Sequence, residues 1–284
     1  MEVKLARKRG FCFGVEDAIE LAERILSEKG TGGVVALGPV IHNAQVVERL
    51  ERAGLNQSAD LESLAPGSSV LIRSHGAAPE TYQQVRDRGL EIVDATCVLV
   101  KRAQTVVRQL HEEGYQVVMI GDANHPEVRG VIGYAPNVIV VDSEEHLDEV
   151  LPPRGRLGIL CQTTHAPEHV AEMIGAIARR PFRELKVVNT LCLEVVRRQE
   201  AAVELAHEVD VMFVLGGLHS ANTQELARLC REEGTRTFHL ETWDQFKPEM
   251  VDGCRVAGVT AGASTPDFII DAFVHKLEAF PAAG

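Results

Sequence analysis

The sequence predicts an α/β protein built from three small, pseudo-equivalent domains with mostly parallel sheets around a central site. Three observations lead to this prediction. Strand-like runs alternate with amphipathic helical stretches, three cysteines each precede one such helix, and the segments after these cysteines repeat one spacing. Strands that alternate with helices are typical of parallel sheets covered by helices.

Six short runs rich in β-branched residues each end in glycine or a small polar residue, as buried strands do. They lie within residues 34–43, 70–76, 117–127, 157–165, 211–222 and 256–264. Between them, apolar residues recur at helical spacing, most clearly over Val15–Ser27, Val100–Glu113 and Val196–Glu208. We therefore expect helices in these three stretches.

The repeat is visible when residues are counted from Cys12, Cys97 and Cys192. The next strand ends 24 to 26 residues later, at Gly38, Gly121 and Gly216, and a polar residue follows four positions on, at His42, His125 and Ser220. A second strand ends near Ser74–His75, Thr163–Thr164 and Ser264–Thr265. Such a long period does not fit a solenoid. It predicts three domains, over residues 1–96, 97–188 and 189–284.

Equivalent loops of three such domains, packed around a pseudo-threefold axis, would point at one cavity. Ligands of parallel α/β sheets bind beyond the carboxyl ends of the strands, where these loops lie. The three cysteines and the polar loop residues are therefore predicted to meet in one site.

Three cysteines at helix starts are suited to bind a metal cluster. The helix N-terminus lowers the pKa of a thiol, and thiolates are soft ligands for Fe–S clusters, zinc or Cu(I). Because none of the cysteines forms a C-x-x-C pair, a structural zinc is disfavoured. One ligand from each domain suits a [4Fe–4S] cluster with one open iron, which can act as a Lewis acid.

The alternative is that cysteines simply fill the core, since cysteine is among the most buried residue types. We expect this of Cys161, Cys230 and Cys254. For the other three cysteines the repeat alone leaves both interpretations open. A noncatalytic scaffold that binds zinc or a labile cluster is the corresponding functional alternative.

The net charge of the chain restricts the kinds of partner that it is expected to bind. The formal net charge of −12 disfavours binding to nucleic acid or to anionic membranes. The sequence shows no long apolar run and no secretory signal, so we expect a cytoplasmic protein without a membrane span.

Nine short motifs appear in a fixed order along the chain. They are GFCFGV, VIHNAQVV, RSHG, DATC, NHPEVRG, QTT, RRQEA, SANT and TAGASTPD. In combination they resemble the LytB/IspH family of 4-hydroxy-3-methylbut-2-enyl diphosphate reductases, from about Val3 to Phe273. That family has three pseudo-equivalent α/β domains around a central Fe–S cluster, which agrees with the repeat.

The resemblance implies specific roles. Cys12, Cys97 and Cys192 would be the cluster ligands, Glu127 the proton source and Thr163 its relay partner. The diphosphate would be bound by His42, His75, His125, Ser220, Asn222 and Ser264, whose side chains are good donors to phosphoryl oxygens. The implied reaction uses two electrons and two protons to expel the substrate hydroxyl as water, and gives isopentenyl or dimethylallyl diphosphate. Ferredoxin or flavodoxin would supply the electrons.

Five residues depart from the family pattern: Val98, Leu193, Glu194, Val195 and Ala221. Glu194 is the most notable, because a buried carboxylate without a partner near the substrate would be costly. A diverged paralogue that acts on another substrate at the same cluster is therefore an alternative to the family reaction.

His165 and His169 lie four residues apart, a spacing that suits a metal site on a helix. Pro167 between them favours a helix start instead. We therefore expect both histidines to be ordinary surface or core residues.

Overall fold

The computed structural model describes residues 1–30, 33–58, 60–62, 64–145, 147–152 and 155–280. The chain divides into two compact units. Unit 1 comprises Met1–Glu16, Ile41–Val47 and Leu193–Gly284, and unit 2 comprises Asp17–Val40 and Glu48–Cys192. Within the described residues every strand pair is parallel, and the strands form three four-stranded sheets. The predicted α/β class with three parallel sheets is confirmed.

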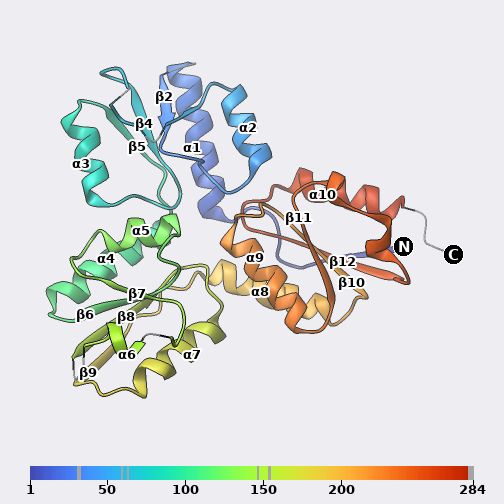
Figure 1. Cartoon of the computed structure of the whole chain (residues 1–284). Helices are drawn as coiled ribbons and strands as arrows, with labels where there is room; N and C mark the ends of the chain where they lie inside the picture. Colours follow the sequence, from blue (N-terminus) through green and yellow to red (C-terminus); the bar gives the residue numbers. More distant parts are fainter. Residues whose placement is uncertain (31–32, 59, 63, 146, 153–154, 281–284) are drawn as a thin grey trace. The chain divides into compact units, whose positions relative to one another are not determined.

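The first sheet lies in unit 2 and has the order β3-β2-β4-β5. Its strands are β2 (Val34–Ala36), β3 (Asn56–Gln57), β4 (Ser69–Ile72) and β5 (Glu91–Asp94). The helices of this part of the chain are α1 (Phe13–Lys29), α2 (Ala44–Arg52) and α3 (Pro79–Asp87). Val70 and Ile72 of β4 pack against Val85 of α3, which joins the helix to the sheet. Figure 1 shows α3 beside β4 and β5.

The second sheet also lies in unit 2 and has the order β7-β6-β8-β9. Its strands are β6 (Gln116–Ile120), β7 (Ile139–Val141), β8 (Arg156–Cys161) and β9 (Glu184–Val187). The helices are α4 (Val98–Glu112), α5 (Pro126–Ile132), α6 (Leu147–Val150) and α7 (Pro167–Ala178). One apolar core joins the sheet to α4 and α5, and a second joins its other face to α6 and α7.

The third sheet lies in unit 1 and has the order β11-β10-β12-β1. Its strands are β10 (Val211–Leu215), β11 (Arg236–Leu240), β12 (Val256–Ala261) and β1 (Glu2–Leu5). The helices are α8 (Leu193–Ala206), α9 (Ala221–Glu232) and α10 (Asp267–Glu278), with the 3₁₀ turns η1 (Trp243–Gln245) and η2 (Pro248–Val251). One face packs on α8 and α9, and the other on α10 through an aromatic cluster around Phe213 and Phe273.

All three sheets share one strand order, which confirms that the modules are alike. In the first and second sheets the fourth strand follows the third along the chain, at β5 and β9. In the third sheet the N-terminal strand β1 takes this place beside β12. The predicted first domain began at residue 1, whereas the structure places Glu2–Leu5 in the sheet of the last segment. β1 pairs with β12 and so supplies the fourth strand, at the edge of a sheet whose other three strands come from the C-terminal segment.

The helices predicted after the three cysteines are confirmed as α1, α4 and α8. Each begins directly after its cysteine, at Phe13, Val98 and Leu193. Among the described residues, none of the helices combines the length and the apolar character that a membrane crossing requires.

Candidate active site

The three cysteines occupy equivalent positions in the modules. Each backbone N–H donates to a carbonyl two residues beyond the third strand of its sheet. Cys97 N donates to Ser74 O at 3.0 Å, and Cys192 N to Thr163 O at 2.9 Å, both within unit 2. In unit 1, Cys12 N donates to Ala263 O at 3.2 Å. The sequence repeat is therefore a structural repeat at the level of individual hydrogen bonds.

Local turns fix two of these cysteines in the same way. Three residues before Cys97, the Asp94 carboxylate accepts a hydrogen bond from Thr96 N at 3.0 Å. Three residues before Cys192, the Asn189 side chain accepts one from Leu191 N at 2.9 Å. Asp and Asn favour such turns because their short side chains bond to the backbone two residues on. The DATC and NTLC segments therefore share this turn.

The other three cysteines do not directly precede a helix. Cys161 and Cys230 are fully buried inside apolar clusters, which confirms the prediction that they fill the core. Burial raises the pKa of the Cys230 thiol to about 12, so this side chain stays a thiol. Cys254 is only half-buried and packs at the edge of the aromatic cluster.

Glu127 and Thr163 form a buried pair in unit 2. Glu127 lies in the first turn of α5 and Thr163 follows β8, and both are almost fully shielded from water. Thr163 N donates to Oε1 of Glu127 at 2.8 Å, and Thr163 Oγ1 donates to Oε2 at 2.8 Å. Burial raises the pKa of Glu127, although the two bonds from Thr163 and the charge of His165 partly oppose this shift. A buried carboxyl of this kind keeps its proton to a higher pH than an exposed glutamate.

Thr163 connects this acid to a cysteine. Its side chain and N–H bond to Glu127, and its carbonyl accepts from Cys192 N. A continuous series of hydrogen bonds thus runs from the carboxyl group to the backbone of one predicted ligand.

Two predicted histidines lie beside this pair. His125 caps α5, with its Nδ1 accepting a hydrogen bond from Glu127 N at 3.2 Å. The His75 ring meets the His125 ring edge-on, with centroids 5.5 Å apart. Gly130 of α5 packs so tightly on the His75 loop that a Cβ there would lie 3.2 Å from His75 O. Unit 2 therefore brings together His75, His125, Glu127 and Thr163.

The other predicted polar residues lie in unit 1. Ser264 Oγ donates to His42 O at 3.1 Å, and Ser220 caps α9 by accepting from Thr223 N. Asn222 in the first turn of α9 is 6% exposed, and neither its Nδ2 nor its Oδ1 has a hydrogen-bond partner among the described residues. A buried amide without partners is costly, so Asn222 is suited to a polar ligand.

The structure shows the surroundings of four of the five departures from the family pattern. Val98 and Leu193 are 60% and 66% exposed, whereas Val195 is buried in α8. Glu194 forms an ion pair with Lys8 at 2.8 Å, and this interaction lowers its pKa. Glu194 is therefore not an unpartnered carboxylate, and the energetic cost considered above does not arise, because Lys8 of the same unit neutralises its charge.

Sequence reasoning missed the residue that anchors the Cys12 segment. Arg198 of α8 is fully buried, and its Nη2 donates to Gly10 O at 2.9 Å. The RRQEA motif contains Arg198, but nothing in its local pattern indicates a partner 188 residues away.

The chain matches the family described as LytB protein over residues 3–278. That match covers nearly all of it. The chain belongs to the LytB family.

Two relatives match this chain over nearly their whole length. A protein named 4-hydroxy-3-methylbut-2-enyl diphosphate reductase from Geobacter sp. (strain M21) is 44% identical over 280 residues, which cover 98% of each chain. One of the same name from Aquifex aeolicus is 43% identical over 282 residues, which cover 98% of this chain and 96% of the relative.

Two solved structures share the fold. A structure titled (E)-4-hydroxy-3-methyl-but-2-enyl diphosphate reductase, the terminal enzyme of the non-mevalonate pathway, is 42% identical with a TM-score of 0.72 and covers 98% of this chain and 99% of its own. The E-1-hydroxy-2-methyl-but-2-enyl-4-diphosphate reductase from Plasmodium falciparum is 25% identical with a TM-score of 0.92 and covers 97% of this chain and 87% of its own.

Proposed function

We propose that this LytB-family chain is a 4-hydroxy-3-methylbut-2-enyl diphosphate reductase that produces isopentenyl and dimethylallyl diphosphate. The observation that carries the proposal is the hydrogen-bonded series from Glu127 through Thr163 to Cys192. It links a buried acid with a raised pKa to a predicted metal ligand. The names of full-length relatives at 43–44% identity support the same reaction.

Cys12, Cys97 and Cys192 are the residues that would hold a [4Fe–4S] cluster through three thiolates, which leaves one iron open. The equivalent hydrogen bonds at their backbones and their places at helix starts fit such a donor set. When bound, this cluster supplies electrons and a Lewis-acidic iron.

The protein's own residues manage the protons. In the reaction the substrate's C–O bond breaks, the oxygen leaves as water, and a new C–H bond forms at the allylic group. This consumes two electrons and two protons. Burial raises the pKa of Glu127 and so favours its protonated form, and the Thr163 hydroxyl at 2.8 Å can pass the proton on.

The diphosphate would be bound by His42, His75, His125, Ser220, Asn222 and Ser264. Asn222 gives the strongest support, because its buried amide has no partner among the described residues. Since the chain carries a net charge of −12, only a local set of donors can attract this anion. We further propose ferredoxin or flavodoxin as electron donor and the cytoplasm as location.

Anaerobic turnover tests the proposal. The protein with its cluster reconstituted is given a strong reductant and the hydroxylated C5 diphosphate, and the products are identified. We expect isopentenyl and dimethylallyl diphosphate. An intact cluster without turnover would favour a paralogue for another substrate, and zinc without iron or sulfide would favour the noncatalytic scaffold.

Gly217→Ala tests the diphosphate pocket in unit 1. A Cβ at Gly217 would lie 2.5 Å from His42 O, so the loop that carries His42 must move. Such overpacking typically costs about 1–3 kcal/mol of folding stability. This energy is an upper limit on the loss of substrate binding, so we expect a measurable rise in KM of at most roughly 150-fold, with a smaller change in kcat.

Gly175→Ala is the matched control, because the nearest atom to its new Cβ is the flexible end of Arg179 at 3.7 Å. Its KM should equal that of the wild type. If Gly217→Ala also leaves KM unchanged, the loop that carries His42 does not contribute to substrate binding.

A further inference from the structure

A second cluster of potential ligands lies in unit 2, at the carboxyl ends of β7 and β8. Asp142 directly follows β7, His165 lies between β8 and α7, and His169 lies in the first turn of α7. In the sheet, β6 lies between β7 and β8. The side chains that follow these two strands nevertheless come close to one another. The reaction proposed above assigns no role to these three residues, although the charge of His165 lowers the pKa of Glu127.

The geometry of the cluster is close to that of a metal site. Nε2 of His165 and Nε2 of His169 each lie 3.1 Å from Oδ1 of Asp142. One ligand atom from each residue falls within 4.8 Å of the other two. Zinc bonds of ~2.0–2.1 Å in a tetrahedron place ligand atoms about 3.3–3.4 Å apart. The two histidine–aspartate distances are therefore within a few tenths of an ångström of that value.

One of these imidazoles pairs with Asp142 without a well-formed hydrogen bond. His169 makes a hydrogen bond with Asp142. His165 Nε2 is shielded from water and has no hydrogen bond of acceptable geometry among the described residues, although Asp142 Oδ1 is near. A buried nitrogen in this position is better satisfied by a metal ion that it shares with the carboxylate.

Asp142 supplies a carboxylate oxygen beside the two imidazole nitrogens, a donor that suits a cation. Its side chain is 48% exposed, so a hydrated ion can reach the site.

We propose that Asp142, His165 and His169 bind one divalent transition-metal ion of the zinc class. Two imidazoles and a carboxylate are typical ligands of zinc, cobalt and nickel, and water would complete the coordination. This site is separate from the cysteine trio and uses nitrogen and oxygen donors instead of sulfur.

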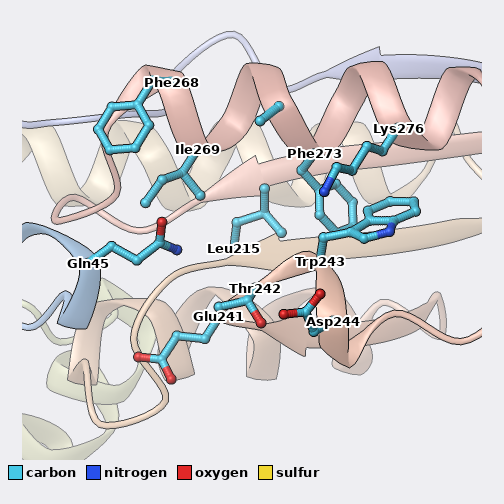
Figure 2. Close-up of a pocket in the computed structure, with 11 residues that line it drawn as sticks. Gln45, Leu215, Glu241, Thr242, Trp243, Asp244, Phe268, Ile269, Phe273 and Lys276 are labelled. Carbon is cyan, nitrogen blue, oxygen red and sulfur yellow. The ribbon is translucent and has the colours of Figure 1, made fainter.

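The third sheet offers an internal comparison. Glu241 directly follows β11 as Asp142 follows β7, and Ile269 lies eight residues after β12 as His169 lies eight residues after β8. Figure 2 shows both side chains at a cavity of unit 1 that is also lined by Phe268 and Trp243. The carboxylate is present there but an isoleucine replaces the imidazole. The third module therefore lacks this set of ligands, so the cluster does not follow from the shared fold alone.

Zinc uptake by the anaerobically purified, cluster-containing protein tests the proposal. Wild type, His169→Gln and Asp142→Asn are dialysed against low-micromolar Zn²⁺ at neutral pH, and bound zinc, iron and sulfide are measured in each sample. We expect wild type to hold about one zinc more than either variant, with equal iron and sulfide in all three. Zinc should also raise the melting temperature of wild type but not of the variants, because a ligand stabilises the state that binds it.

His207→Gln is the matched control. His207 forms a similar pair with Glu233 at 3.2 Å, on the surface of unit 1 and without a third ligand in the groups found among the described residues. This variant should bind as much zinc as wild type. Equal zinc uptake and equal melting shifts in wild type and His169→Gln would overturn the proposal and leave a simple charge cluster. Because iron and sulfide are measured separately, that result would not affect the proposed reductase activity.

Discussion

Cys97→Ser is expected to lose its iron and sulfide and to have no turnover above background. Serine keeps the shape of the side chain but replaces a soft thiolate by a hard, poorly ionised hydroxyl, which binds an Fe–S cluster weakly. Even residues that only support metal ligands contribute about 10- to 100-fold to affinity, so the loss of a ligand should exceed this. Iron and sulfide analysis after anaerobic reconstitution is the measurement, followed by the turnover assay.

The equivalence of the modules sharpens this prediction. Cys12 and Cys192 make the same backbone hydrogen bond as Cys97, so their serine variants should lose the cluster in the same way. Cys254→Ser is the control, because Cys254 is also half-buried but belongs to an aromatic cluster in unit 1. It should keep full iron and activity. A Cys97→Ser protein with its full complement of iron would show that the trio does not hold the cluster.

The sequence predicted the central strands of each sheet and missed the edges. The six predicted runs correspond to β2, β4, β6, β8, β10 and β12, which occupy the two inner positions of the three sheets. Inner strands of parallel sheets are buried on both faces and read as continuous apolar runs. The strands that were not predicted, such as β5 (EIVD) and β11 (RTFHL), lie at edges and contain polar residues. Their short, mixed sequences carry no distinct period.

Much of the candidate site followed from spacing, because equivalent modules put equivalent residues at strand ends. The cysteines and the residues at the strand tips were found in this way, and the Asp94 and Asn189 turns explain why the spacing holds. Pairings over long sequence distances were not predictable. Lys8 neutralises Glu194, and Asp142 meets two histidines that the sequence assigned to a helix start. Such contacts depend on which loops the fold brings together.

Glu127→Gln should lower kcat by about 10²–10⁴-fold, the usual contribution of a positioned general acid, with little change in KM. Glutamine has the same shape, and its amide can still accept from Thr163 N and bond to Thr163 Oγ1. The variant therefore loses the proton without losing the packing. Steady-state kinetics of the reconstituted protein measure the effect, and an unchanged iron content verifies that the cluster is intact.

The pH dependence gives a second test of the same residue. Burial raises the pKa of Glu127, so the group stays protonated above the ordinary range of glutamate and loses its proton as pH rises through the shifted value. Wild-type kcat should fall with increasing pH on that limb, and the limb should be missing from the residual activity of Glu127→Gln.

Protein stability should follow the same sign. A raised pKa means that the folded state binds the proton more tightly than the unfolded state, so stability declines as pH rises from the unfolded value through the folded one. Glu127→Gln carries no such charge, and its melting temperature should fall less than that of wild type over this range. If wild type and Glu127→Gln show the same dependence of kcat on pH and the same dependence of melting temperature on pH, Glu127 does not titrate as the buried acid of this site.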